Sequence, residues 1–255
     1  MSFFCFLIIL IFLFVFFDVF TKGGTYLSFS LFTTTPAENE KGVLQAIVGS
    51  FLMVFNASLI SIPIGIFLGV FLAENKSSKL AIFARNCVDT LFGIPSIVIG
   101  IVAYLCFVLP IGNFSLFSAS MALSLLFLPI LTKSTEEGVL LISQDIKEAA
   151  QALSVPYHKV ILKVIIPSCL KNIFSGIILG VARISGETAP LLFTAFGNSF
   201  LSFHLFKPID ALPLVIYNYA LSPYEQWQNT AWACSLLLIL FVLLLSITGR
   251  WLIQR

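Results

Sequence analysis

The chain has 255 residues, of which 59% are hydrophobic and only 10% are charged, and its formal net charge is +2. Its mean hydropathy is +1.04. Water-soluble domains carry about 25% charged residues, so the composition indicates an integral membrane protein, excludes an ordinary soluble enzyme and gives no sign of a nucleic-acid partner. A membrane span takes about 20 residues, so a single domain of this length has room for about five to seven helices. A β-barrel would show shorter, alternating strands, and we therefore expect an all-α bundle.

Six apolar segments follow one another and predict six membrane-spanning helices, at approximately 3–20, 43–73, 90–109, 118–131, 173–196 and 231–252. The first lacks the basic start and the small-residue cleavage site of a signal peptide, so we expect an uncleaved helix. Helix-breaking residues interrupt the next three, namely Pro63, Gly65, Gly69, Gly93, Pro95 and Pro129. Such residues are tolerated in membrane helices where a neighbouring helix packs closely.

The distribution of lysine and arginine predicts the orientation. The loops after the second and fourth helices, together with the C-terminal end, hold ten of the 14 basic residues, whereas the loops after the first, third and fifth helices hold three. Cytoplasmic loops of membrane proteins carry the excess of Lys and Arg. We therefore expect both termini in the cytoplasm, and with them the long polar segment 133–171.

Signatures of metal sites and of enzymes are missing from the sequence. The five cysteines are scattered singly without a CxxC pair, and the two histidines lie far apart, so buried apolar thiols are expected rather than metal ligands or disulfides. No phosphate-binding P-loop, dinucleotide fingerprint, HExxH or GxSxG motif occurs. We expect a chain that does not hydrolyse ATP by itself and binds no cofactor.

One polar run, DIKEAAQALSVPYHKVILKVIIP at 145–167, breaks the apolar monotony. Its apolar residues recur at i, i+3, i+4 and i+7 and predict a helix with one apolar face, formed by Ile146, Ala149, Ala150 and Leu153. Pro156 ends this helix, and a second short helical run leads to Pro167. Two short helices joined by a bend, presented from a membrane, predict a docking element for a partner protein.

The fifth apolar segment contains a charged pair, Arg183 and Glu187. A charged residue near the centre of a membrane helix costs roughly 2.5–3.5 kcal/mol, which implies a polar cavity or a partner charge. An ion pair between positions i and i+4 is the simpler interpretation, although apolar residues could replace such a pair without loss. We favour a role in lining an anion path or bracing a gate. With Ser185 and Thr188 as nearby donors, the arginine suits an oxyanion better than a cation or a sugar.

The spacing within the polar run resembles the EAA loop of ABC-importer permeases, E-A-A-x3-G-x9-I-x-L-P. Glu148, Ala149, Ala150 and Pro167 match, and the departure is Ser154, where the family usually has Gly. The resemblance implies that these five residues form the segment that couples the permease to an ATPase.

The rest of the chain resembles one branch of that family, the A-type permeases of phosphate-specific importers, from Leu31 onward. The runs that carry the resemblance are 42–74, VDTLFGIPSIVIGIVAY at 88–104, ARISGETAPLLFTA at 182–195 and ALPLVIYNYALSP at 211–223. The resemblance implies a single type I ABC-importer permease domain of six transmembrane helices in a bacterial inner membrane, with inorganic phosphate as substrate. It also implies the partners: a C-type permease, two copies of a cytoplasmic ATPase that hold ATP and Mg, and an extracytoplasmic phosphate-binding protein.

Three alternatives remain open from the sequence. The first is a permease for another oxyanion such as molybdate or sulfate; the run VARISGETAP favours phosphate, and Glu187 would reject sulfate by accepting the proton of hydrogen phosphate. The second is an ATP-independent channel or carrier, which would show inverted halves and no ATPase-docking loop. The third, an intramembrane enzyme, lacks a nucleophile–base or metal pairing.

Overall fold

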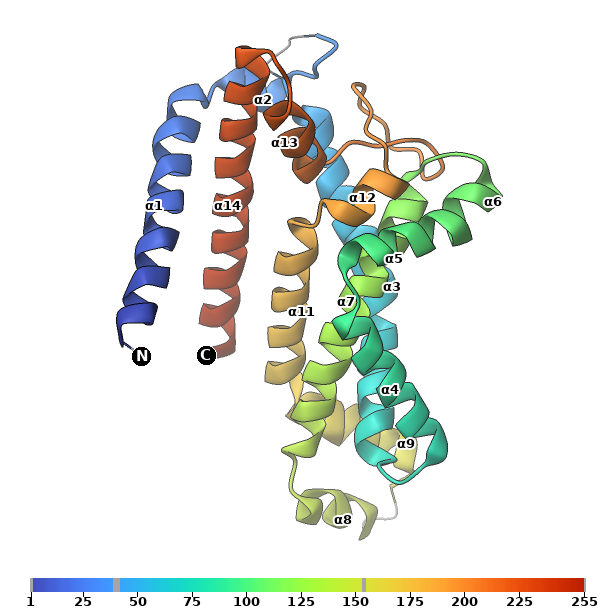
Figure 1. The fold of residues 1–255 in the computed structure, drawn as a ribbon. Helices are drawn as coiled ribbons and strands as arrows, with labels where there is room; N and C mark the ends of the chain where they lie inside the picture. Colours follow the sequence, from blue (N-terminus) through green and yellow to red (C-terminus); the bar gives the residue numbers. More distant parts are fainter. Residues whose placement is uncertain (1, 39–41, 153–154, 255) are drawn as a thin grey trace.

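The computed structural model describes residues 2–38, 42–152 and 155–254 and shows an all-α protein (Figure 1). Within these residues there is no β-strand, and a single parallel bridge joins Phe196 to Ile209. The helical elements in chain order are α1 (Ser2–Tyr26), α2 (Phe29–Thr33), α3 (Leu44–Glu74), α4 (Lys79–Gly93), α5 (Ser96–Ala103), the π-helix η1 (Tyr104–Val108), α6 (Leu109–Ile111), α7 (Leu116–Leu140), α8 (Gln144–Ala152), α9 (Tyr157–Val160), the π-helix η2 (Ile161–Ile165), α10 (Ile166–Ser168), α11 (Leu170–Ser185), α12 (Ala189–Thr194), α13 (Leu212–Ala220) and α14 (Glu225–Gln254).

Four of these helices, α1, α3, α7 and α14, are each long and apolar enough to cross a membrane. Two bent pairs add up to two further spans: α4 with the stretch 96–111, bent by 109°, and the stretch 157–168 with α11, bent by 67°. The described chain therefore has four to six candidate spans by length and composition, and it is a multi-pass membrane protein.

The observed helix boundaries differ from the predicted ones around the third and fifth apolar segments. The third segment, predicted at 90–109, begins as helix at Lys79 and breaks at Ile94, because Pro95 restricts the residue before it to extended backbone. The fifth, predicted at 173–196, begins at Leu170 and stops at Ser185, and the chain resumes as α12 only at Ala189. Both breaks fall where glycine and proline stand close together in the sequence.

The fourth predicted helix, 118–131, was placed too short, and helix covers more of the segment 133–171 than the two short runs predicted there. Helix α7 runs from Leu116 to Leu140 straight through Pro129, which is buried among its neighbours. A membrane helix accommodates proline when surrounding helices enclose the freed backbone carbonyl. The rest of the polar segment is helical too, over α8, α9, η2 and α10.

Two prolines lie just after the two π-helical turns. Pro110 follows η1 and Pro167 follows η2. A proline ring in a regular helix clashes with the carbonyl four residues earlier, and a π-turn displaces that carbonyl. The π-turn therefore explains how the helical stretch 157–168 continues past Val164 into Pro167.

The centre of the bundle is α7, which is mostly buried between α3 and α11. Glycines allow this approach: a β-carbon on Gly69 of α3 would lie 2.6 Å from Cβ of Thr135, and one on Gly176 of α11 would lie 2.6 Å from Cβ of Ser134. Gly180 of α11 lies against the ring of Phe127, which is fully buried. Close packing of small residues is how membrane helices associate tightly, so α3, α7 and α11 form one compact unit.

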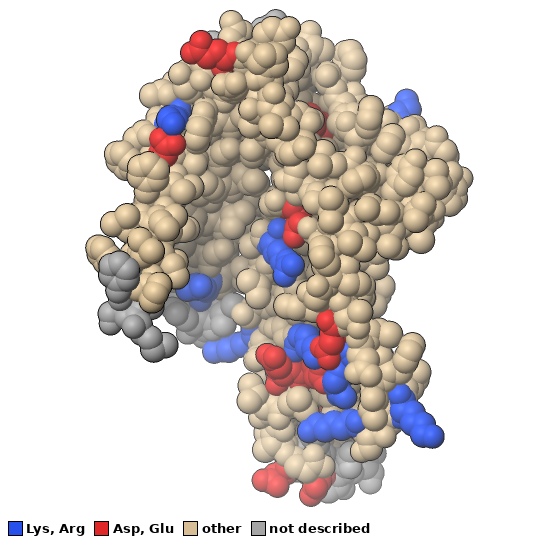
Figure 2. Space-filling model, in the orientation of Figure 1, with Lys and Arg blue, Asp and Glu red and all other residues tan. Residues whose placement is uncertain are grey.

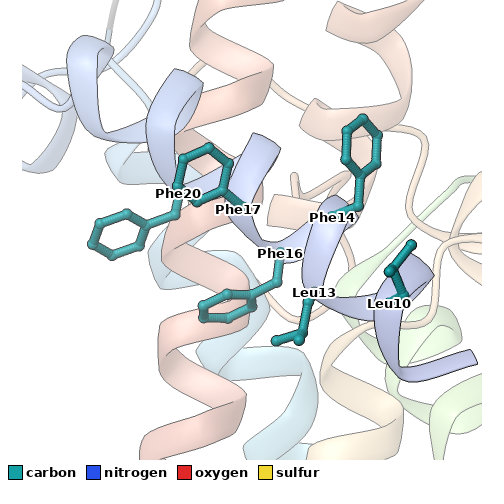
Figure 3. Close-up of a pocket in the computed structure, with 6 residues that line it drawn as sticks. All are labelled: Leu10, Leu13, Phe14, Phe16, Phe17 and Phe20. Carbon is teal, nitrogen blue, oxygen red and sulfur yellow. The ribbon is translucent and has the colours of Figure 1, made fainter. Parts of the chain in front are cut away.

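Helix α1 packs on α14 and exposes most of its other side chains. Figure 3 shows six of them, Leu10, Leu13, Phe14, Phe16, Phe17 and Phe20, around a shallow hollow on this helix. All six are apolar, so this hollow suits lipid or another apolar helix and offers a polar solute nothing.

Both termini lie toward the same end of the molecule, the end from which α8 extends, whereas α2 and α13 lie at the opposite end (Figure 1). Figure 2 shows charged side chains gathered over the end formed by α4, α8 and α9, with few at mid-height. The cytoplasmic location of the termini and of α8 stays a prediction from the distribution of Lys and Arg.

Candidate translocation site and coupling segment

The predicted charged pair lies where α11 ends. Arg183 Nε is 3.7 Å from Glu187 Oε1, with 44% of the Arg183 side chain and 17% of the Glu187 side chain exposed. The guanidinium also lies over the ring of Phe92 of α4, 5.8 Å from its centroid, within the range of a cation–π contact. A charge-assisted hydrogen bond would measure about 2.7–2.9 Å, so Glu187 does not saturate the donors of Arg183. The guanidinium of Arg183 could therefore bind an anion while it weakens its contact with Glu187.

The two predicted donors beside this pair are placed differently. Ser185 is buried, donates its hydroxyl to the carbonyl of Val181 at 2.6 Å, and lines an apolar pocket between α3, α11 and α14. Two positions along a helix turn the side chain by about 200°, so Ser185 points away from Arg183 and does not join its cluster. Thr188 is the residue before α12, next to Glu187 in the break. The structure thus brings Arg183 and Glu187 together and separates Ser185 from them.

The predicted coupling residues lie on and after α8. Glu148 and Ala149 are exposed, and so is Ile146. Ala150 is half-buried and packs against the core, so the apolar face of α8 is divided between this chain and the outside. Pro167 is exposed in α10. Ser154 lies outside the described residues.

A charged cluster that the sequence analysis missed joins α4 to α7. Glu136 of α7 is 5% exposed, and Arg85 of α4 donates to it from Nη2 at 2.7 Å and from Nε at 2.9 Å. Lys133 lies 2.6 Å from Asp89 and 4.0 Å from Glu136. The spacings Arg85–Asp89 and Lys133–Glu136 are those of residues on one helix face, and this signal went unused because both stretches were read as loop.

A hydrogen bond ties the segment after α8 to the end of α3. Tyr157, the first residue of α9, donates its hydroxyl to Glu74 Oε2 at 2.6 Å. Glu74 is the last residue of α3. The two residues are 83 positions apart in the chain, and nothing in the local sequence indicates that they meet.

At the opposite end of α3, a buried carboxylate holds the loop between α12 and α13. Asp210 is 8% exposed; its Oδ2 accepts from Gln45 Nε2 at 3.1 Å and its Oδ1 from the backbone of Ala211 at 2.9 Å. Burial raises the pKa of Asp210 to about 6, and the two hydrogen bonds oppose that shift only in part. No role for Asp210 was predicted from the sequence.

Within the described residues, no group of three or more His, Cys, Asp or Glu side chains could hold a metal ion. Cys87 and Cys106 are exposed free thiols, and Cys169 and Cys234 are buried free thiols. The charged clusters described above are ion pairs.

Residues 65–255 match the protein family described as binding-protein-dependent transport system inner membrane component. The phosphate transport system permease protein PstA of Haemophilus influenzae is 45% identical over 244 residues, which cover 94% of this chain and 86% of that relative. The PstA proteins of Xylella fastidiosa (strain 9a5c) and Yersinia pestis are 43% and 42% identical, over 92% of this chain and over 83% and 81% of the relatives.

Among solved structures, the inward-facing MetNI methionine ABC transporter is similar with a TM-score of 0.66 and 18% identity, over 83% of this chain and 92% of that chain. An amino acid ABC transporter with histidines is similar with a TM-score of 0.54 and 18% identity, over 81% and 92% of the two chains. At this identity the likeness concerns the fold, which is that of an ABC-importer permease.

Proposed function

The chain belongs to the family of binding-protein-dependent transport system inner membrane components, and within it to the PstA phosphate permeases; on this basis we propose that it is the A-type permease subunit of an ATP-driven importer for inorganic phosphate. The observation that carries this is the 45% identity to a PstA protein over 94% of the chain. Its all-α fold, with four to six candidate spans, suits that role.

Arg183 is the residue we propose to meet the anion. Phosphate at neutral pH carries one to two negative charges, and a guanidinium binds its oxygens through paired N–H donors. The 3.7 Å ion pair with Glu187 positions the arginine when no substrate is bound. Thr188 stands beside the pair as a further donor, whereas the contacts of Ser185 argue for packing rather than for substrate contact.

Glu187 supplies a means of selection within this proposal. Hydrogen phosphate can donate its proton to the carboxylate in a hydrogen bond, which offsets the repulsion between the two negative charges. Sulfate has no proton at neutral pH, so the carboxylate beside the arginine only repels it. Molybdate is rejected for the same reason.

The coupling segment is the second half of the proposal. Glu148, Ala149 and Ala150 on α8, with Ser154 and Pro167 after it, form the segment that two copies of a cytoplasmic ATPase would engage on this chain and its C-type permease partner. ATP and Mg belong to the ATPase, and the chain itself binds no cofactor. An extracytoplasmic phosphate-binding protein delivers the substrate, and residues 1–255 act as one permease domain in a bacterial inner membrane.

The exposed Ile146 and Ala149 support this docking, because they leave an apolar strip on a helix that extends from the charged end of the molecule. ATP-driven closure of the ATPase would displace α8, and the helices that it joins, α7 and the stretch 157–168, would move with it.

Deletion of the encoding gene in its native cell tests the function. We expect uptake of radiolabelled phosphate at low external concentration to fall and to return when the wild-type chain is supplied, while sulfate uptake stays unchanged. Unchanged phosphate uptake together with a loss of sulfate or molybdate uptake would overturn the proposal.

A further inference from the structure

The last turn of α3 is a point where several helices are bonded together. The carbonyl of Leu72 accepts from Arg85 Nη2 of α4 at 2.9 Å, and Arg85 also pairs with Glu136 of α7. Two residues further on, Glu74 accepts the hydrogen bond of Tyr157 from α9. The C-terminal end of α3 is thereby tied to α4, to α7 and to the segment that follows α8.

Tyr157 is held in place by the backbone around it. Pro156 precedes α9 as its N-terminal cap residue, and its carbonyl accepts from the N–H groups of Lys159 and Val160. Val160 is fully buried and anchors the turn in the core. Helix α8 packs against α9 and η2, so a displacement of α8 moves the residue at the head of α9 with it.

The ring of Tyr157 contributes little to the core, because 45% of the residue is exposed. Its hydroxyl, however, makes a 2.6 Å bond to a carboxylate, the length of a strong charge-assisted O–H···O⁻ bond. Tyr157 therefore contributes mainly through the hydrogen bond that connects α9 to α3, and little through packing.

Helix α3 is suited to carry a displacement from that tie to the other end of the molecule. Its 31 residues extend about 46 Å at 1.5 Å per residue. Near the Tyr157–Glu74 hydrogen bond, Gly69 lets α3 pack closely against α7. Near the other end of α3, Gln45 donates a hydrogen bond to Asp210. The helix is continuous through Pro63, so a displacement at one end can reach the other.

We propose that Tyr157 is a positioning residue that passes the movement of α8 to α3 through its hydrogen bond to Glu74. This inference rests on the proposed function and adds a third connection to the two covalent ones, α8 to α7 and α8 to α11. The covalent connections move the helices that flank the coupling segment. The hydrogen bond makes α3 move with them, so that closure of the ATPase is converted into opening of the path.

The test uses the complete transporter, purified with its ATPase and reconstituted in proteoliposomes, and measures phosphate uptake and ATP hydrolysis in the same sample. Tyr157→Phe removes the hydroxyl and keeps the ring. We expect the phosphate moved per ATP hydrolysed to fall about fivefold or more, with ATP hydrolysis retained. Tyr217→Phe is the matched control, because Tyr217 is also 45% exposed and lies on α13, away from the tie.

Two variants of Glu74 separate coupling from general damage. Glu74→Gln keeps an oxygen that accepts the Tyr157 hydroxyl, so we expect it to retain most of the coupling, whereas Glu74→Ala should lose at least as much as Tyr157→Phe. The double variant Tyr157→Phe with Glu74→Ala should be no worse than Glu74→Ala alone, because Glu74→Ala already removes the bond to Tyr157.

The inference is overturned if Tyr157→Phe keeps the wild-type ratio of phosphate to ATP, if it lowers uptake and hydrolysis in equal proportion, or if it no longer co-purifies with the ATPase. Additive losses in the double variant would also contradict it. Failure of the proposed function is a separate outcome: the wild-type complex would then move no phosphate.

Discussion

Arg183 Nε lies 3.7 Å from Glu187 Oε1, and the two residues bracket the last turn of α11. The N–H of Gly186 donates to the carbonyl of Arg183, and the N–H of Glu187 donates to that of Ile184, so the backbone of the break is held by hydrogen bonds. The backbone of Glu187 is therefore held although the residue stands beyond the helix. With the carboxylate 3.7 Å away and 44% of the Arg183 side chain exposed, a mobile anion could compete for the guanidinium.

Arg183→Gln removes the positive charge and leaves a shorter, uncharged polar side chain. We expect phosphate uptake to fall by at least about tenfold, because a lost charge-assisted contact costs roughly 1.5–3 kcal/mol, while the complex still assembles. Uptake of radiolabelled phosphate and co-purification of the partner subunits measure the two effects. Arg250→Gln, an exposed arginine near the end of α14, is the control. Normal phosphate uptake by Arg183→Gln would contradict the proposal that Arg183 binds the anion.

Cysteine crosslinking tests the orientation of α8. With the exposed Cys87 and Cys106 replaced by serine, cysteines at Glu148 or Ala149 should crosslink to the ATPase, because both positions are exposed. Ala150→Cys is the control on the same helix, since Ala150 packs against this chain's own core and should react far less. Failure at both exposed positions, or equal reaction at all three, contradicts the docking of α8.

The Arg85–Glu136 pair should contribute measurably to stability. Arg85→Met leaves the Glu136 side chain, which is 7% exposed, with only the more distant Lys133 at 4.0 Å among the described cations, so we expect a loss of about 3 kcal/mol and a lower Tm in detergent. Arg85→Met with Glu136→Gln should recover much of this loss, because no buried charge is then left unpaired. Asp18→Asn, which breaks an exposed pair with Lys22, should cost less than about 1 kcal/mol. A Tm for Arg85→Met equal to that of Asp18→Asn would refute the role of the pair.

Asp210 predicts a pH dependence of stability. Its pKa is raised from 3.8 to about 6 by burial, so the folded state favours the protonated carboxyl. That preference stabilises the protein fully below about pH 3.8 and is lost as the pH rises through about 6. Between pH 5 and pH 7, the Tm of the wild type should therefore fall relative to that of Asp210→Asn, whose amide does not titrate. If the Tm values of the two proteins changed in parallel over this range, burial would not raise the pKa of Asp210.

Features set by local sequence could be predicted. The helix α8 follows from the spacing of Ile146, Ala149 and Ala150 within a single run, and the contact of Arg183 with Glu187 follows from their separation by four positions. The helix α8 depends only on helical geometry, whereas Glu187 lies beyond the end of α11 and reaches Arg183 because the two are only four positions apart.

Features set by the packing of distant helices could not be predicted from the sequence. Arg85 and Glu136 are 51 positions apart, Tyr157 and Glu74 are 83 apart, and Gln45 and Asp210 are 165 apart, so their meeting depends on how whole helices stack. The same holds for Ser185, which looked like a donor for the anion by its position in the sequence. Its place on α11 turns it toward α3 and α14 instead. Pro129 was expected to end or kink its helix, and the neighbours that enclose it allowed α7 to continue.

Competition in reconstituted proteoliposomes tests the central claim most directly. The complete transporter is supplied with ATP on its cytoplasmic side, and uptake of radiolabelled phosphate is measured with an excess of unlabelled phosphate, sulfate or molybdate on the other side. We predict uptake that requires ATP and that only unlabelled phosphate abolishes. Uptake without ATP, or equal competition by sulfate or molybdate, would contradict a phosphate-specific, ATP-driven importer.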